Sequence, residues 1–223
     1  FRDWLVSEGL YVFTMNGFPY GAFHGTRVKD RVHHPDWTTP ERLDYTLRLF
    51  RQLQFLLPEG MEGGTSTSLN SYRHWHTSEA DRDRVLRRGA QQMAEVAAAL
   101  WKVRNEHGID LHLDIEPEPD GLLENTEDVV RFYSRFLLPE GIPMLEKHLG
   151  LGPEDARDAL THHIALCYDI CHFALAYESP KDVFPKLQSE GIRIGKVQVS
   201  AALKIRPEPG DRKKALQTLQ EFD

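Results

Sequence analysis

The sequence predicts an α/β fold, an incomplete (β/α)8 TIM barrel with about five of the eight βα units, in one domain spanning residues 1–223. Strand-like segments alternate with helix-like segments along the whole chain. No G-x-G-x-x-G motif joins a strand to its following helix, which counts against a doubly wound dinucleotide-binding sheet. A barrel with one active-site face also requires a polar residue near the C-terminal end of each strand, and the candidates are Asn16, Ser66, Glu116, Asp169 and Gln198.

Composition narrows the classes of function. The chain has 223 residues, 40% hydrophobic and 27% charged, which is enough for one sizeable core. Its net charge of -7 argues against nucleic acid as a partner, because phosphate binding needs clustered Lys and Arg. No apolar run approaches the roughly 18 residues that a membrane helix needs, so we expect no membrane insertion. The two cysteines, Cys167 and Cys171, form no disulfide framework, which predicts a reducing, cytoplasmic location.

The first half of the chain begins with a short helix that ends before a strand at residues 10–15 (LYVFTM). A helix then starts around Pro40, where Thr38 and Glu41 have the spacing of a capping box, and Pro58 ends it. A weaker strand candidate follows at residues 61–69. Ser78 caps a long helix that runs to about Asn105, with Gly108 just past its end.

The second half repeats the strand and helix alternation. Strands are predicted over residues 109–116, 163–169 and 192–199. Helices are predicted to begin at Asn125-Thr126, Pro153, Ser179-Pro180 and Gly210-Asp211. The segment after Asp169 is expected to be a loop. Because five strands are fewer than eight, we expect at least one strand before Phe1 and two after Asp223.

Two carboxylates carry the functional hypothesis. Glu116 and Asp169 each end a predicted strand, and neighbouring parallel strands lie about 4.8 Å apart. Both can therefore reach one cation at about 2.1 Å from each oxygen. Without a cation the two charges repel and one carboxylate takes up a proton, so the pair is either a metal site or an acid/base dyad. The competing interpretation is that both are helix-capping or loop carboxylates.

Neighbouring polar residues extend this hypothesis. His172 is a candidate third ligand, or a donor that supports a ligand or touches substrate, although a packed loop histidine is the commoner case. Gln198 could ligate through its amide oxygen, bind a substrate hydroxyl or fill a layer of the barrel. Glu118 competes with Glu116, and the alternation of the strand favours Glu116.

The long loops supply candidate substrate contacts. The segment NGFPYGAFHG contains Asn16 and His24 among aromatic residues, and a later loop contains Trp75. Aromatic residues on an active-site face often line a metabolite pocket, but they can equally form a hydrophobic lid. Three further groups of histidines lack a matching acidic partner in sequence, and we expect them to be exposed to solvent: His33 and His34, His74 and His76, and His162 and His163.

Several segments together resemble a known family. LCYDICHFALAY resembles the D-x-C-H segment of the xylose-isomerase-like TIM-barrel superfamily, which includes endonuclease IV, and LDIEPEPDGLLENTED resembles its glutamate-bearing strand. The segments NGFPYGAFHG, STS, LDIEPEPDG, CYDICHFA and GKVQVSAAL are more closely similar to EboE-type metabolite-traffic proteins, a branch of that superfamily. The resemblance covers nearly the whole chain.

The resemblance implies a metal-dependent sugar or sugar-phosphate isomerase or epimerase that acts on a small polar metabolite. The implied ligands of a divalent Zn, Mn or Mg ion are Glu116 and Asp169, with Glu116 also the base and His172 a substrate-facing or supporting group. Gln198 stands where the family has a histidine, which favours an alternative: a barrel that binds or carries a metabolite without catalysis. A second alternative is an endonuclease IV-like phosphodiesterase, against which the acidic balance counts.

Overall fold

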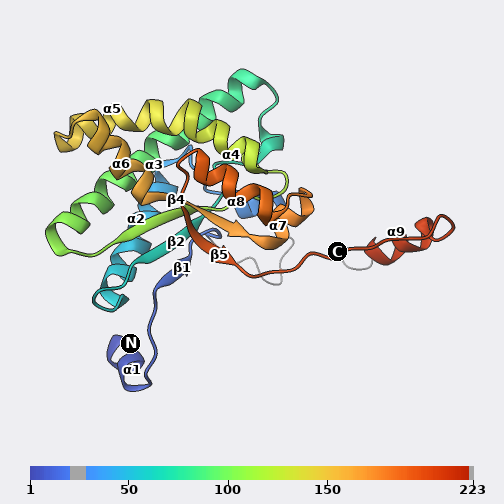
Figure 1. Cartoon of the computed structure of the whole chain (residues 1–223), viewed down its shortest axis with the longest axis horizontal. Coiled ribbons are helices and arrows are strands. Elements are labelled where there is room, and N and C mark those ends of the chain that lie inside the picture. Colours follow the sequence, from blue (N-terminus) through green and yellow to red (C-terminus); the bar gives the residue numbers. More distant parts are fainter. Residues whose placement is uncertain (21–28, 221–223) are drawn as a thin grey trace.

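The chain folds around a curled parallel sheet of five strands in the order β1-β2-β3-β4-β5. The computed structural model describes residues 1–20 and 29–220 (Figure 1). Strand β5 contacts β2 and β3 as well as its neighbour β4, so the sheet bends into a half-barrel. The strands are β1 (Thr14–Asn16), β2 (Gly63–Thr67), β3 (Leu111–Ile115), β4 (Ile164–Asp169) and β5 (Ile194–Gln198).

Helices cover the convex side of this sheet. Helices α2, α3 and α6 pack directly on the strands, and α5 packs on α3 and α6 as an outer layer (Figure 1). The helices are α1 (Arg2–Ser7), α2 (Pro40–Leu56), α3 (Glu79–His107), α4 (Thr126–Phe132), α5 (Leu138–Leu149), α6 (Pro153–His163), α7 (Ile170–Leu175), α8 (Pro180–Ser189) and α9 (Arg212–Gln220). The predicted alternation of strands and helices is therefore confirmed over the described residues.

Local sequence signals explain most of the helix ends. The Ser78 side chain accepts a hydrogen bond from the backbone N–H of Asp81, and Gly108 ends the same helix in the left-handed conformation with φ of 68°. The expected capping box at α2 is wrong. Thr39 is the N-cap and makes no side-chain cap hydrogen bond, because its hydroxyl donates to the Asp36 carbonyl oxygen. The Thr38 hydroxyl donates to the Asp36 carboxylate.

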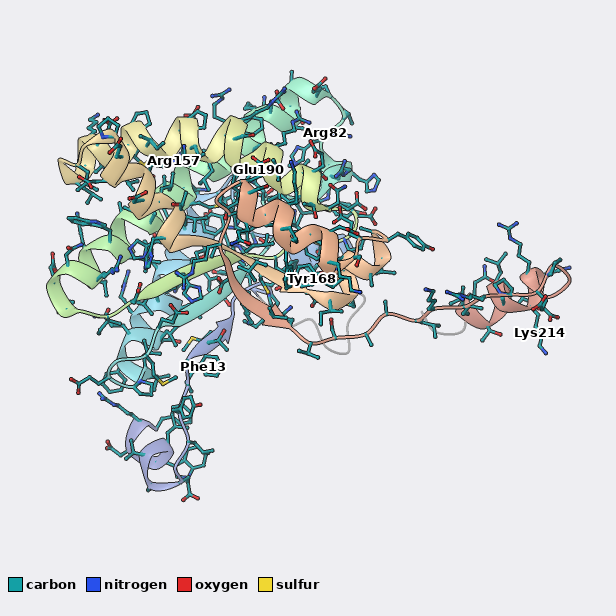
Figure 2. The ribbon with its side chains drawn as sticks, viewed as in Figure 1. Phe13, Arg82, Arg157, Tyr168, Glu190 and Lys214 are labelled. Carbon is teal, nitrogen blue, oxygen red and sulfur yellow. The ribbon has the colours of Figure 1, made fainter. Side chains whose placement is uncertain are left out.

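Strand β1 is shorter than predicted. Only Thr14–Asn16 pair with β2, whereas residues 10–13 precede the strand. Leu10, Tyr11 and Phe13, which precede β1 (Phe13 is labelled in Figure 2), are each about half exposed. Phe13 accepts one hydrogen bond from the Gly64 N–H at 3.1 Å, but regular pairing with β2 begins at Thr14, so high β-propensity alone does not extend the strand.

Two helices, α7 and α5, are absent from the sequence prediction. Asp169 caps α7, so the expected loop after β4 is a helix of one and a half turns. A π-helical segment, Tyr133–Leu137, joins α4 directly to α5, which continues through Pro143. The tertiary contact that accompanies the π segment is a hydrogen bond of 3.0 Å from the Tyr133 hydroxyl to the carbonyl oxygen of Ile164.

The strands separate an apolar face from a polar one. Leu111, Leu113 and Ile115 of β3 are fully buried in the core under the helices. Because side chains alternate along a strand, His112 and Asp114 face the concave side of the sheet together with the following Glu116. On β4, Tyr168 packs on Phe173 of α7 and Phe184 of α8, with ring centroids 4.3 and 4.9 Å apart (Figure 2).

Two glycines let the half-barrel close over the polar face. A Cβ atom on Gly64 would lie 2.4 Å from the Asp114 carboxylate, and one on Gly195 would lie 2.1 Å from it. Both distances are far below van der Waals contact, so only glycine fits between β3 and its neighbours at this level. These glycines fix how closely β5 approaches β3.

The two ends of the described chain extend away from the sheet. Helix α1 lies below β1, and α9 follows a long extended segment after β5 (Figure 1). No residue of α9 is buried. Among the described residues, no helix has the length and apolar character to cross a membrane.

Candidate functional site

Three strand ends converge at the C-terminal rim of the half-barrel. Glu116 follows β3 immediately, Asp169 is the last residue of β4 and Gln198 is the last residue of β5. The Gln198 amide nitrogen donates one hydrogen bond to Glu116 Oε1 at 2.7 Å and one to Asp169 Oδ2 at 2.8 Å. The structure thus brings the two predicted carboxylates together, with the amide nitrogen between them. Gln198 faces them through its nitrogen, whereas ligation through its amide oxygen was one of the roles that the sequence left open.

Glu116 is the more confined of the two carboxylates. The residue is 5% exposed, and Oε2 has no hydrogen-bond partner among the described residues. Burial raises the pKa of Glu116 above its ordinary value, while the Gln198 hydrogen bond and the charge of His172 oppose this effect. A buried carboxylate oxygen without a partner suits a bound cation or a proton. Glu116 is therefore compatible both with a metal site and with an acid/base dyad.

Asp169 lies in a donor-rich environment. Its Oδ1 accepts a hydrogen bond of 2.9 Å from the Cys171 backbone N–H and a short one from the Ser200 hydroxyl. Burial alone would raise the pKa of Asp169, but these hydrogen bonds outweigh it and the pKa lies below its usual range. The pKa of Asp169 is thus lowered where that of Glu116 is raised, and opposite shifts in neighbouring carboxylates are typical of an acid/base pair.

His172 projects from α7 toward the same rim. Its Nδ1 lies 2.9 Å from the carbonyl oxygen of Pro117 and 3.9 Å from Glu116 Oε1. A carbonyl oxygen only accepts, so Nδ1 carries the hydrogen and neutral His172 has its lone pair on Nε2. The side chain is 17% exposed, which leaves it accessible at the mouth of the half-barrel.

Glu118 and an aromatic wall flank the rim. Burial, with the charges of Glu116 and Asp169 adding to it, raises the pKa of Glu118 to about 8. His33 Nδ1 lies 3.5 Å from Glu118 Oε1. Trp75 stacks on His34 with ring centroids 4.0 Å apart and lies edge-on to His33. Trp75 therefore belongs to a packed aromatic cluster next to the site.

Two other predicted contacts lie elsewhere. Asn16 pairs in register with Ser66, and Ser66 pairs with Asp114. Asn16 therefore lies level with Asp114, two residues before Glu116. Its Oδ1 accepts hydrogen bonds from the Phe18 N–H at 3.0 Å and from the Ser66 hydroxyl at 3.3 Å. These bonds hold the turn after β1. His24 lies outside the described residues.

A group of polar residues inside the half-barrel, below the rim, was not predicted from the sequence. His112 Nδ1 lies 2.7 Å from Asp114 Oδ1, and Asp114 is fully buried with Oδ2 unpartnered among the described residues. Lys196 of β5 donates to Ser66 at 3.3 Å, and its charge lowers the pKa of Asp114 against the larger effect of burial. A cavity of about 230 Å³ borders His112 and Lys196. The signal was present in HLDIE, where three titratable residues alternate on one face of a strand.

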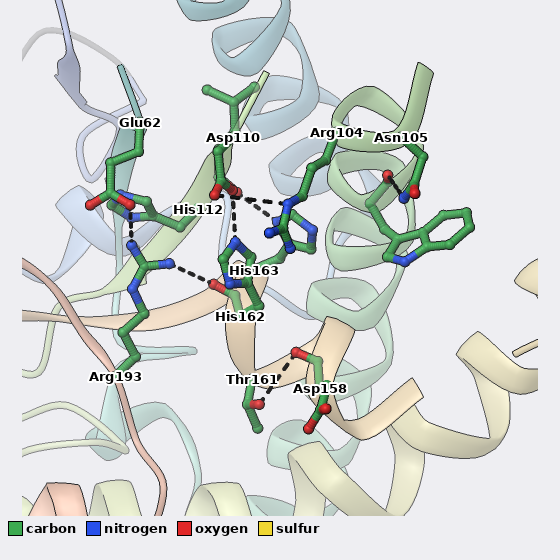
Figure 3. A network of polar contacts seen from close by, with 12 residues as sticks. Glu62, Arg104, Asn105, Asp110, His112, Asp158, Thr161, His162, His163 and Arg193 are labelled. Carbon is green, nitrogen blue, oxygen red and sulfur yellow. Dashed lines mark hydrogen bonds and ion pairs between the residues drawn. The ribbon is translucent and has the colours of Figure 1, made fainter. Parts of the chain in front are cut away.

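A second polar network lies at the opposite, N-terminal end of the strands (Figure 3). His162 Nε2 is 2.7 Å from Asp110 Oδ1, and Arg104 Nε is 3.9 Å from Asp110 Oδ2. His163 is fully buried and its Nδ1 donates to the Leu111 carbonyl oxygen at 2.7 Å, so the expectation of solvent exposure is wrong for His163. It is also wrong for His33, which is 5% exposed. The network ties α6 to the start of β3, the face of a barrel where polar residues serve stability.

One further group of residues, Ser71, His76 and Asp81, is arranged in the order of a hydrolase triad. Ser71 Oγ lies 2.9 Å from His76 Nε2, and His76 Nδ1 lies 3.2 Å from Asp81 Oδ2. However, the Ser71 hydroxyl also lies 2.5 Å from Asp36 Oδ2, and Ser71 is 1% exposed. The single hydroxyl hydrogen of Ser71 is donated to Asp36 Oδ2, so Ser71 does not donate to His76. The group fastens loops together and presents no accessible nucleophile.

The fold and the rim define an α/β protein with a curled parallel sheet and a site of carboxylate, amide and imidazole groups at its C-terminal edge. A scan of the chain against protein-family models found no match. A search of curated proteins also found no significant match.

Proposed function

We propose that the chain is a metal-dependent sugar or sugar-phosphate isomerase or epimerase of the xylose-isomerase-like superfamily, of the EboE type, acting on a small polar metabolite in the cytoplasm. One observation carries the proposal: Glu116 and Asp169 meet at the strand ends, and the buried Oε2 of Glu116 lacks a partner among the described residues. Such an oxygen is stabilised by a cation or by a further hydrogen-bond donor, and a substrate-bound metal ion would supply the first.

The architecture that goes with this function is the (β/α)8 barrel, of which the half-barrel supplies five units. Its support is the uninterrupted parallel order of the strands and the curl that brings β5 toward β2. The exposed Val197 on β5 also suits further packing at that edge. A structure of a longer chain in which β5 has no further strand neighbour would contradict this part of the proposal.

The residues divide the chemistry between them. Asp169 and Glu116 would hold a divalent ion of the Zn, Mn or Mg class, and such an ion would polarise a carbonyl or hydroxyl group of the substrate. Glu116, whose pKa is raised by burial, accepts and returns the proton at the neighbouring carbon. His172 lies at the mouth of the site, where its ring serves either as a further ligand or as a contact for a substrate oxygen, and the wall that includes Trp75 excludes water from one side.

Hydrogen exchange tests the isomerase proposal across a panel of candidate substrates. The purified chain, loaded in turn with Zn²⁺, Mn²⁺ and Mg²⁺, is incubated in D₂O with a range of aldoses, ketoses and their phosphates. Proton NMR follows loss of the hydrogen next to the carbonyl. We expect exchange with at least one compound, its loss in Glu116→Gln, and its retention in the matched surface variant Glu154→Gln. Absence of both metal binding and exchange would refute the proposal.

A second candidate is a barrel that binds a metabolite without turning it over. The observation in its favour is that the Gln198 amide nitrogen already fills the position between the two carboxylates. An amide in that position donates a hydrogen bond to one oxygen of each carboxylate without a metal ion. Saturable binding of a compound from the same panel, unaffected by metal chelation and without deuterium incorporation, would favour this candidate over the first.

A further inference from the structure

The rim also contains a thiol, and it lies within reach of the proposed ion. Asp169, Cys171 and His172 each offer one ligand atom, and these atoms all lie within 4.8 Å of one another. Ligand atoms around one zinc ion lie roughly 3.3–3.8 Å apart, as bond lengths of about 2.0–2.3 Å require. A contraction of about 1 Å would therefore bring the group around one ion.

The local fold holds the thiol beside Asp169. Asp169 caps the N-terminus of α7, and the Cys171 backbone N–H binds both Asp169 Oδ1 and Ser200 Oγ at 2.9 Å. Cys171 is partly exposed, whereas Cys167, the other cysteine, is fully buried on β4.

The neighbours of Cys171 have free coordinating capacity. His172 spends Nδ1 on the Pro117 carbonyl oxygen, and a backbone hydrogen bond of this kind is how metal-binding imidazoles are commonly oriented. Glu116 is 5% exposed with Oε2 unpartnered among the described residues, and it lies across Gln198 from Asp169. The rim thus offers oxygen, nitrogen and sulfur atoms together.

We propose that Cys171 is a ligand of the rim ion together with Asp169 and His172, and that the site takes a thiophilic ion of the zinc class in preference to Mg²⁺. The inference rests on the proposed function, which requires a metal ion at this rim. Thiolate and imidazole ligands favour Zn²⁺, whereas Mg²⁺ prefers oxygen ligands in octahedral geometry. On binding, the S–H bond of Cys171 breaks, an S–Zn bond forms and the proton leaves to solvent.

The other cluster with metal-binding residue types is less suited to an ion. Asp110, His162 and His163 also offer ligand atoms within 4.8 Å of one another. Asp110, however, already pairs with His162 at 2.7 Å and lies 3.9 Å from the cationic Arg104. A guanidinium next to the carboxylate repels a second cation.

Cobalt provides a spectroscopic test because the chain has only two cysteines. Co²⁺ is titrated into the wild type, Cys171→Ser and the matched control Cys167→Ser, and thiolate-to-cobalt charge transfer is followed in the near ultraviolet. We expect the band in the wild type and in Cys167→Ser, and its loss in Cys171→Ser. By calorimetry, Cys171→Ser should weaken Zn²⁺ binding about tenfold or more. Mg²⁺ should not compete with Zn²⁺.

Alkylation of the unmodified chain covers the case in which a variant fails to fold. Zn²⁺ should protect Cys171 from N-ethylmaleimide, and Mg²⁺ should not, as read by mass spectrometry of the labelled peptide. Metal binding that depends on Glu116 but gives no charge-transfer band and no protection overturns the role of Cys171 and leaves the metal site standing. A band that disappears in Cys167→Ser also overturns it. No binding of Zn²⁺, Co²⁺, Mn²⁺ or Mg²⁺ overturns both proposals.

Discussion

Gln198 is the residue whose replacement tests the rim most directly. Its amide nitrogen donates to Glu116 at 2.7 Å and to Asp169 at 2.8 Å. Gln198→Leu keeps a side chain of similar size but removes both donors. Glu116 Oε1 and Asp169 Oδ2 then lose their hydrogen bonds from Gln198, and the two carboxylates face each other without a donor between them.

The magnitude follows from the two lost bonds. A hydrogen bond to a charged group contributes about 1.5–3 kcal/mol. Gln198 is partly exposed, so water replaces part of the loss and the lower end of the range applies to each bond. We therefore expect Gln198→Leu to lower the free energy of unfolding by about 3 kcal/mol at neutral pH. For a chain of this size that corresponds to a fall in Tm of about 6–12 °C.

Urea and thermal unfolding, followed by circular dichroism without added metal, measure this loss. Gln188→Leu on the exposed surface of α8 is the matched control, and its effect should stay within about 0.5 kcal/mol. The double variant Glu116→Gln with Gln198→Leu should lose less than the sum of the two single variants, because the charge that needed the donor is gone. A loss below about 1 kcal/mol for Gln198→Leu, or strict additivity in the double variant, would refute the reasoning.

Three other predictions test the fold that positions the site. Gly195→Ala should destabilise the chain by about 3 kcal/mol, because the new Cβ would lie 2.1 Å from the Asp114 side chain. The control Gly210→Ala, where the new Cβ enters open space, should change stability little in the same urea assay. Equal unfolding midpoints for the two variants would contradict the close approach of β5. Burial lowers the pKa of His163 from 6.5 to about 4, so the unfolded chain binds the proton first and stability should fall by about 3 kcal/mol as pH drops from 6.5 to 4. His163→Asn should flatten this part of the stability profile, and an unchanged slope would count against the buried neutral ring. Ser78→Ala should cost about 1 kcal/mol through loss of the α3 cap, and an unaltered thermal midpoint would show that the cap contributes nothing.

Elements with strong local signals could be predicted from the sequence. The long helix from Ser78 to Gly108 has a cap, an apolar stripe and a left-handed terminator, and each acts within a few residues of the chain. Where the outcome depended on distant partners, the prediction failed. Residues 10–13 have strand propensity but lie outside the regular pairing with β2, which begins at Thr14. Helix α7 was also missed, although its cap, in which the Cys171 N–H donates to Asp169, spans only two residues.

In the candidate site, too, some features follow from local signals and others from distant partners. The placement of Glu116 and Asp169 at strand ends follows from alternation and from the residues that stop each strand, so it could be predicted from sequence. The orientation of Gln198 could not, because an amide faces with its oxygen or its nitrogen according to the groups around it. The burial of His163 and the polar interior at Asp114 likewise depended on which strands became neighbours.

The sequence by itself determined the order of strands and helices and the set of polar residues at the strand ends. These properties depend on side-chain periodicity, caps and turns, which act over a few residues. Only the tertiary structure decided that Gln198 lies between Glu116 and Asp169, that Cys171 lies beside them, and that Gly64 and Gly195 admit the Asp114 side chain. Apart from the neighbouring Asp169 and Cys171, those contacts join residues tens of positions apart, and their distances are set by the curl and register of the sheet.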